Sequence, residues 1–254
     1  MFCARYVLPD GTAMRYGIIA DIHGNLEAFE SVLESLSRAK IEKYLCAGDI
    51  IGYGADPREC IKMTRELDAV AVLGNHDAAS AGLIGMDYFN DVSAKAVKWT
   101  KQNMEENDFN FLKSIGFTYV NKHLTLVHGT LRKPSEFNYM TDPEAAGETF
   151  NLMKTDICFI GHTHVPGVFS LKGGELSYSR KKKTAISAGE RLIVNVGSVG
   201  QPRDGDPRSC YAVYDTDEAS VVLKRVAYDV KKAQKKILKT GLSPFLADRL
   251  GAGV

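Results

Sequence analysis

The first part of the chain alternates between short apolar runs and segments in which apolar residues recur every three or four positions. Apolar runs at residues 15–20, 43–47 and 69–73 predict β-strands. Between them, helical spacing predicts helices over residues 26–39 and 57–67, the second with a proline in its first turn. Strands and helices in this order predict parallel strand pairing, with the helices packed on the faces of the sheet.

The middle of the chain predicts one long helix followed by a hairpin. Residues 87–115 have helical spacing throughout, with Tyr88, Val92, Ala96 and Trp99 near one stripe, which is typical of side chains that pack into a core. Residues 117–120 and 124–127 then alternate around a turn in which we expect His123 to be a surface residue. A helix at 144–153 and a buried strand at 157–160 follow.

Beyond residue 165 the pattern changes to strands and turns, near 167–171, 191–196, 209–214 and 221–226. The basic run at 180–183 is interpreted as a solvated hairpin tip. The chain finishes with two lysine-rich helical segments, at 230–240 and 244–250, predicted to form a solvated cover. This order favours an α/β fold, a four-layer sandwich of two mixed β-sheets flanked by helices.

The domain prediction is a single unit over residues 14–254, preceded by a possible N-terminal extension at residues 1–13. A chain of 254 residues is long for one domain, but α/β sandwiches commonly reach about 250. Within the unit, the segments near 78–115 and 170–188 are candidates to cap a pocket.

Composition excludes several classes of function. Hydrophobic residues make up 44% and charged residues 25%, as in ordinary globular proteins, and the net charge of +1 carries no strong signal for nucleic acid or an anionic membrane. No apolar stretch is long enough to span a membrane, so we expect a cytoplasmic protein. The cysteines are scattered without a Cys-x-x-Cys pair, which indicates reduced thiols and no zinc–thiolate site. They are Cys3, Cys46, Cys60, Cys158 and Cys210.

Five short motifs share one placement, because each follows an apolar strand-like run and ends in residues able to bind a metal. They are GIIADIHGN at 17–25, CAGDIIGYG at 46–54, VLGNHD at 72–77, LTLVHG at 124–129 and ICFIGHTHVPG at 157–167. In open α/β folds, loops at the carboxyl ends of the strands converge on the ligand site. One pocket can therefore collect all five.

The polar residues of these motifs are the candidate site. They are Asp21, His23, Asp49, Asn75, His76, His128, His162 and His164. Taken singly, each is equally well interpreted as a turn residue, a helix cap or a satisfied polar group. Taken together, buried imidazoles and carboxylates repel and lose hydration unless cations compensate. Imidazole, carboxylate and amide ligands without thiolates favour a catalytic divalent-metal site, and Asp49, in a glycine-flanked loop, is a natural bridge between two ions.

The series D-x-H, G-D-x-x-x-x-G, G-N-H-D, V-H-G and G-H-T-H, in this order over nearly the whole chain, resembles the calcineurin-like metallophosphoesterase superfamily. The closest resemblance is to its small prokaryotic phosphodiesterase branch, which includes diadenosine tetraphosphatase-like proteins. As a five-part signature the match is specific, whereas any one piece would be weak.

The resemblance implies a role for each motif position. One ion is bound by Asp21, His23 and His164, the other by Asn75, His128 and His162, with Asp49 as the bridge. It further implies in-line attack of a metal-bridging hydroxide on a phosphodiester or nucleotide phosphoanhydride, with His76 facing the substrate. Two divalent ions are implied, Mn²⁺ first, with Fe, Zn, Co, Ni or Mg as alternatives.

One departure from the family pattern concerns the Asp49 loop. Protein phosphatases of the superfamily have G-D-x-V-D-R-G there, whereas this chain reads Gly-Asp-Ile-Ile-Gly-Tyr-Gly and lacks the second Asp and the Arg. The partner of His76 is therefore unidentified, and Asp77 is interpreted either as a group that orients an imidazole or as a helix cap. Arg132, Arg203 and Tyr53 are the candidates for gripping substrate phosphate.

Three functions stay open on the sequence. The first is a metal-dependent phosphodiesterase or nucleotide hydrolase that acts on a small phosphate ester. The second is a phosphomonoesterase or protein phosphatase, which the missing Arg disfavours. The third is a catalytically silent binding scaffold, which the retention of His76 and of all metal positions disfavours. Oligomerisation is possible.

Overall fold

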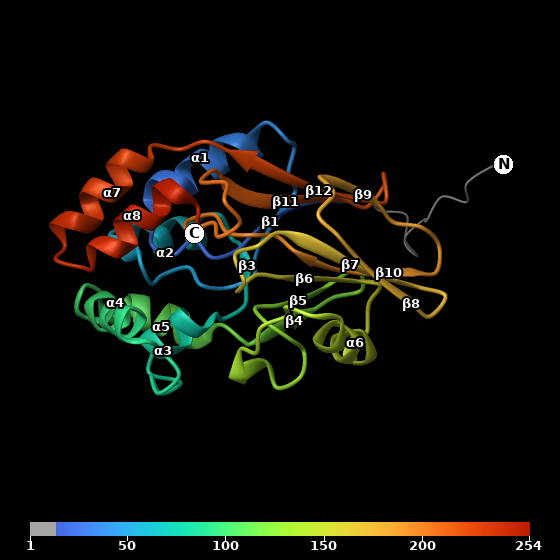
Figure 1. The fold of residues 1–254 in the computed structure, drawn as a ribbon, viewed down its shortest axis with the longest axis horizontal. Helices are drawn as coiled ribbons and strands as arrows, with labels where there is room; N and C mark the ends of the chain where they lie inside the picture. The colour runs from blue at the N-terminus through green and yellow to red at the C-terminus, as the bar shows by residue number, and fades with distance from the viewer. Residues whose placement is uncertain (1–13) are drawn as a thin grey trace.

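The computed structural model describes residues 14–254, so the predicted extension at residues 1–13 and Cys3 lie outside the described residues. Residues 14–254 form two mixed six-stranded sheets that pack face to face, with helices on their outer sides (Figure 1). The prediction of a four-layer α/β sandwich is therefore confirmed.

The first sheet has the strand order β3-β2-β1-β11-β12-β9. Its strands are β1 (Arg15–Ile19), β2 (Lys43–Cys46), β3 (Val70–Ala71), β9 (Lys183–Ala185), β11 (Ser209–Asp215) and β12 (Ser220–Val226). The pairs β1–β2 and β2–β3 are parallel, as the alternation of strand and helix predicts, and the remaining pairs are antiparallel.

The second sheet has the order β4-β5-β6-β10-β7-β8. Its strands are β4 (Thr118–Val120), β5 (Thr125–Val127), β6 (Ile157–Ile160), β7 (Gly167–Lys172), β8 (Glu175–Ser179) and β10 (Glu190–Asn195). Strands β5, β6 and β10 are parallel to one another, whereas β4, β7 and β8 are antiparallel to their neighbours. Each sheet thus has a parallel part whose carboxyl ends can carry loops to a common site.

Helices follow in chain order along the same residues. They are α1 (Leu26–Ser37), α2 (Pro57–Glu66), α3 (Asn75–Ser80), α4 (Asp91–Gln102), α5 (Glu106–Ser114), the short 3₁₀ helix η1 (Pro134–Glu136), α6 (Pro143–Leu152), α7 (Val230–Lys239) and α8 (Pro244–Ala252). In Figure 1, α1 lies on the side of the first sheet and α6 on the side of the second. None of the helices in residues 14–254 has the length and apolarity needed to cross a membrane.

The strands separate the core into layers because their side chains alternate between two faces. In β1, Ile18 belongs to the cluster between the two sheets, whereas Ile19 packs on the outer side with α1. In β6, Phe159 points between the sheets and Cys158 packs on the outer side, in the cluster that contains Phe150 of α6. Burial on both faces explains why these strands read as continuous apolar runs.

The prediction of one helix over residues 87–115 is wrong. Residues 91–114 form two helices, and Tyr88, expected in the core, is fully exposed. The side chain of Asn90 caps the start of α4 by accepting the backbone N–H of Ser93, and Asp108 caps the start of α5 by accepting the N–H of Glu105. Each cap starts a new helix and so interrupts the pattern.

Two further expectations differ from the structure. His123 is buried rather than on the surface, and is 6% exposed. The basic run at 180–183 is not a hairpin tip: it links β8 in the second sheet to β9 in the first, so that Lys183 pairs with Val222. Four cysteines are free and buried, as predicted from their scattered positions. They are Cys46, Cys60, Cys158 and Cys210.

Candidate metal centre and its pocket

All five motifs follow the carboxyl ends of parallel strands, two from each sheet and one through β3. Asp21 and His23 follow β1, Asp49 follows β2, Asn75 and His76 open α3 after β3, His128 follows β5, and His162 and His164 follow β6. All of these side chains are buried except Asn75, which is half-buried. The two sheets therefore deliver one group of polar side chains to a shared edge.

Five of these residues have left-handed backbone conformations. The φ angles are 53° at Asp21, 52° at His23, 54° at Asp49, 69° at His162 and 61° at His164. Non-glycine residues rarely adopt positive φ, and when they do the conformation costs of order 1 kcal/mol and is held by its surroundings. Strain concentrated at these positions indicates that side-chain direction, rather than backbone comfort, determines the shape of the loops.

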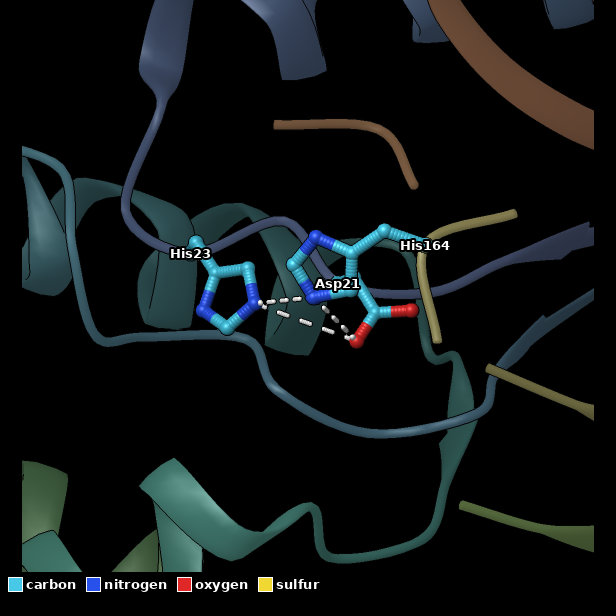
Figure 2. A group of neighbouring side chains, drawn as sticks. All are labelled: Asp21, His23 and His164. Atoms are coloured by element: carbon cyan, nitrogen blue, oxygen red, sulfur yellow. Dashed lines mark hydrogen bonds and ion pairs between the residues drawn. The ribbon is translucent and has the colours of Figure 1, made fainter. Parts of the chain in front are cut away.

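The first cluster consists of Asp21, His23 and His164, which converge as Figure 2 shows. Nε2 of His23 lies 3.0 Å from Nε2 of His164, and Oδ1 of Asp21 lies 3.3 Å from Nε2 of His164 and 3.8 Å from Nε2 of His23. The Asp21 carboxylate also accepts the backbone N–H of His162. Three donor atoms thus face a single point between the loops.

Backbone carbonyls determine which nitrogen of each imidazole faces the site. Nδ1 of His164 lies 2.5 Å from the carbonyl oxygen of Gln201, and Nδ1 of His128 lies 2.6 Å from that of Ala47. A carbonyl accepts only from N–H, so in the neutral rings the lone pair lies on Nε2, the atom that points into the site. Such second contacts are how proteins orient imidazole ligands toward a metal.

The second cluster consists of Asp49, His128 and His162. Oδ2 of Asp49 lies 3.3 Å from Nε2 of His128 and 3.6 Å from Nε2 of His23 in the first cluster. Nε2 of His162 and Oδ1 of Asn75 are buried atoms that have no hydrogen-bond partner in residues 14–254. Buried polar atoms without partners are rare and costly, which indicates a missing positively charged ligand.

Burial and mutual charge explain the electrostatics of the clusters. Burial lowers the pKa values of His23, His162 and His164, so these imidazoles are neutral and their lone pairs are available. At Asp49, burial alone would raise the pKa, but the surrounding imidazoles, His128 foremost, hold it well below its usual range. Burial likewise opposes protonation of His128, yet the charge of Asp49 raises its pKa to about 9.

The donor set fits divalent cations. Imidazole nitrogens, carboxylate oxygens and an amide oxygen converge without a thiolate, which suits Mn²⁺, Fe²⁺, Zn²⁺, Co²⁺ or Ni²⁺. Facing lone pairs on His23 and His164 are repulsive unless a cation or a proton lies between them. Asp49 contacts both clusters, as a carboxylate shared between two ions must.

His76 lies beside the clusters, walled by aromatic rings. Its ring centre is 4.4 Å from that of Tyr53, 4.9 Å from that of His23 and 5.1 Å from that of Phe89. Its Nδ1 is buried without a hydrogen-bond partner in the described chain, and its ring nitrogen also falls within ligand reach of His23 and Asp49. Burial lowers the pKa of His76 to about 4, so the ring is neutral at pH 7.

Asp77 contacts no imidazole by hydrogen bond and instead clamps two loops. Its carboxylate accepts the backbone N–H groups of Ile50, Ile51 and Gly74. Burial, followed by the charge of Asp49, raises its pKa to about 7. Of the two interpretations of Asp77, the helix-cap role is the one that these contacts support, because Gly74 directly precedes α3.

The three candidate phosphate-binding residues are placed differently. Arg203 and Tyr53 line the pocket above the clusters, with the guanidinium carbon of Arg203 5.8 Å from the centre of the Tyr53 ring. Arg132 is not among the lining residues: it lies at the surface and forms an ion pair of 2.6 Å with Glu148. A role of Arg132 in substrate binding stays a prediction, and its guanidinium already has a partner.

The pocket has a volume of about 1130 Å³ and includes residues that the sequence analysis missed. Tyr139 stacks on His162, with ring centres 3.9 Å apart. Phe89, Phe245 and Arg249 also line it. Phe245 and Arg249 belong to α8, which was interpreted as a solvated cover, and an aromatic and an arginine facing the same side of that helix is the only signal that could have indicated otherwise.

Comparison of the sequence with known families and proteins agrees with this geometry. Residues 14–219 match the model of the calcineurin-like phosphoesterase superfamily domain. The chain is 37% identical over 240 residues to the uncharacterized protein MJ0912 of Methanocaldococcus jannaschii, covering 93% of this chain and 97% of that protein. It is 25% identical over 221 residues to phosphodiesterase YfcE of Escherichia coli K12, covering 82% and 91%.

Solved structures show the same fold. A metallophosphoesterase from Sphaerobacter thermophilus superposes with a TM-score of 0.84 at 36% identity, covering 96% of this chain and all of that one. The hypothetical protein PH1004 from Pyrococcus horikoshii superposes with a TM-score of 0.79 at 20% identity, covering 95% and 99%. The family match over most of the chain and the convergence of its five motifs lead to one conclusion: the chain belongs to the calcineurin-like phosphoesterase superfamily.

Proposed function

We propose that this protein is a dinuclear metal-dependent phosphodiesterase, which hydrolyses a phosphodiester or a nucleotide phosphoanhydride. The observation that supports it most is the position of Asp49, whose Oδ2 reaches Nε2 of His23 at 3.6 Å and Nε2 of His128 at 3.3 Å. One carboxylate oxygen thus touches both clusters of donor atoms. This is the arrangement expected of a pair of ions that share a ligand.

In this proposal, Asp21, His23 and His164 hold one ion, Asn75, His128 and His162 hold the other, and Asp49 is shared. Two bound divalent ions supply hydroxide from water near neutral pH and neutralise charge on the phosphoryl oxygens, Mn²⁺ being our first choice. The buried imidazoles contribute by staying neutral, because burial lowers the pKa values of His23, His162 and His164. Carbonyls behind His128 and His164 hold the rings in the required orientation.

His76 is the proposed catalytic residue that contacts the substrate. Its ring lines the pocket beside Asp49 and is held by Tyr53 and Phe89, and its Nδ1 has no protein partner in residues 14–254. A neutral imidazole donates one N–H, which can stabilise a phosphoryl or leaving-group oxygen as negative charge develops there. We propose that His76 makes this contact rather than binding metal.

The substrate is held by the pocket walls. We propose that Arg203 binds a phosphoryl oxygen, because it lines the pocket and its backbone N–H donates to the carbonyl of His164, which places it next to the first cluster. We also propose that residues 84–93, within the predicted cap segment, contact the leaving group, since nine or more of the pocket-lining positions come from that stretch. No residue of 170–188 lines the pocket.

Elemental analysis of the purified protein, followed by assays with added Mn²⁺, tests the proposal. We expect about two ions per chain and faster hydrolysis of bis(p-nitrophenyl) phosphate than of p-nitrophenyl phosphate. Faster cleavage of the monoester would favour the phosphomonoesterase alternative. Metal-loaded protein that cleaves neither these esters nor dinucleoside polyphosphates would contradict the enzymatic proposal and favour a binding scaffold.

A further inference from the structure

A second arginine lies in the pocket, outside the part of the chain that the family model matches. Arg249 belongs to α8, beyond residue 219, yet it lines the same pocket as His76 and Arg203. Figure 1 shows α7 and α8 at the same end of the molecule as α3, α4 and α5. The C-terminal helices therefore supply a wall of the pocket in addition to covering the first sheet.

Neither arginine is neutralised by a protein carboxylate. Nε of Arg249 donates to the carbonyl oxygen of Val254 at 2.5 Å, and the guanidinium of Arg203 donates to the side-chain oxygen of Gln201 at 2.8 Å. No ion pair joins either residue to an Asp or Glu side chain within residues 14–254. Arg249 is half-buried, and burial followed by the charge of Arg203 lowers its pKa to about 10. Two cations held in mutual repulsion without a counter-ion are set to bind an anion.

The arginines occupy different places relative to the metal clusters. Arg203 is tied to His164 through its backbone and lies over Tyr53, next to the reaction centre. Arg249 lies on α8 with its guanidinium carbon 5.0 Å from the centre of the Phe245 ring, which is 53% exposed. A substrate whose scissile phosphate is at the ions and beside Arg203 can thus place a second anionic group near Arg249.

Aromatic side chains accompany this second position. Phe245, Tyr88 and Phe89 all line the pocket, and Tyr88 and Phe245 are exposed although both are large and apolar. Exposed aromatic rings in a pocket are the surfaces on which planar rings stack. The same pocket therefore offers metal-ligating groups, two guanidinium groups and aromatic faces.

We propose that Arg249 is a specificity-determining residue that binds a second, non-scissile phosphate of the substrate, and that the substrate class is a nucleotide carrying at least two phosphates. This inference rests on the proposed phosphodiesterase activity and adds the substrate class to it. The chemistry is a charge-assisted, bidentate contact between guanidinium and phosphate, which Lys reproduces in charge but not in geometry.

A matched pair of chromogenic esters tests the proposal. One is the p-nitrophenyl ester of thymidine 5′-phosphate, and the other carries an additional phosphate on the 3′ oxygen, so the scissile bond is the same. For the wild-type protein we expect kcat/KM to be about tenfold higher for the doubly charged ester. Arg249→Gln should lose this preference, mainly through KM, and Arg249→Lys should keep part of it. Arg38→Ala, an exposed arginine of α1 paired with Glu34, is the control and should keep all of it.

Binding provides a second measurement that does not depend on turnover. Calorimetric titration of the Mn²⁺-loaded protein with thymidine 3′,5′-bisphosphate and with thymidine 5′-phosphate should show about tenfold tighter binding of the bisphosphate, abolished in Arg249→Gln. Equal loss with both ligands and both esters in Arg249→Gln would show a structural role and overturn the inference. So would a wild-type protein that does not distinguish them. Absence of hydrolysis with an intact binding preference would contradict the proposed function instead.

Discussion

Oδ2 of Asp49 lies 3.3 Å from Nε2 of His128, and this carboxylate raises the pKa of the buried imidazole to about 9. In the absence of a cation, His128 therefore carries a proton at pH 7, although burial alone opposes it. A metal ion needs the lone pair of Nε2 and must displace that proton.

The first prediction is that Mn²⁺ binding at pH 7 releases about one proton per chain. The sign follows from the raised pKa: affinity should strengthen as the pH rises toward 9 and weaken as it falls. Calorimetric titrations in two buffers of different ionisation enthalpy measure the release. Equal heats in both buffers would show that His128 is already neutral before binding.

The second prediction concerns the shared carboxylate. Asp49→Asn should lower the bound metal by at least one ion per chain and weaken binding by about 100-fold, because both clusters lose a charged ligand. Elemental analysis after dialysis measures the loss. Asp87→Asn, an exposed position that lines the pocket away from the clusters, is the control and should retain full metal content.

The third prediction separates His76 from the metal ligands. His76→Ala should keep the metal content and lower kcat by about 10² to 10⁴, because a group that donates to the substrate is lost while the clusters remain. His123→Ala, which changes the one histidine outside the motifs, should keep both. A loss of metal in His76→Ala would instead assign His76 to the ligand set that it forms with His23 and Asp49.

The fourth prediction uses Gly52, which has a φ of 142° in the loop that carries Asp49. A Cβ at this position would lie 2.8 Å from Nδ1 of His23 and 2.8 Å from Nδ1 of His76. Gly52→Ala should therefore displace both rings and lower activity by about 100-fold. Gly147→Ala in α6 is the matched control, because its Cβ would meet nothing within 4 Å and should leave activity unchanged.

The fifth prediction concerns the anchor of α7. Nζ of Lys236 lies 2.7 Å from the buried carboxylate of Glu27 and 2.8 Å from that of Asp56. Lys236→Met should lower the free energy of unfolding by about 2 kcal/mol at pH 7, because a charged acceptor loses its main partner. Lys62→Met, from an exposed pair with Glu66, should change it little.

The pH dependence of this fifth effect has a definite sign. Burial raises the pKa of Glu27, but hydrogen bonds from Lys236 and Lys232 outweigh it and leave the pKa lowered. The stability that Glu27 contributes is therefore complete above its unfolded pKa and is lost as the pH falls through the folded value. Denaturant titrations should show that the difference between Lys236→Met and wild type shrinks in acid. A constant difference would mean that Lys236 acts through packing alone.

The loops of the candidate site could be predicted from sequence because each motif directly follows an apolar run. Asp21 after β1 and His128 after β5 are examples in which the strand signal and the polar residue are adjacent in the chain. The rule that parallel strands present their carboxyl ends at one edge then brings the motifs together without knowledge of the rest.

The far wall of the pocket could not be predicted in this way. Helical spacing in α8 shows that one face packs, but not that Arg249 turns toward motifs more than a hundred residues earlier in the chain. Tyr88 misled for a related reason: its spacing is helical, but the cap at Asn90 starts the helix after it. Strands β8 and β9 were missed because most of their side chains are exposed, so neither shows a buried face.

The placement of α8 divides the labour of the protein along its sequence. Everything that touches the ions is encoded before residue 203, whereas Arg249 and Phe245 are encoded by a terminal segment that contributes no metal ligand. Exchange or truncation of that segment in evolution, or grafting by an engineer, can alter which molecules are accepted while the reaction itself is inherited intact. Selectivity and chemistry are in this sense independently heritable parts of one polypeptide.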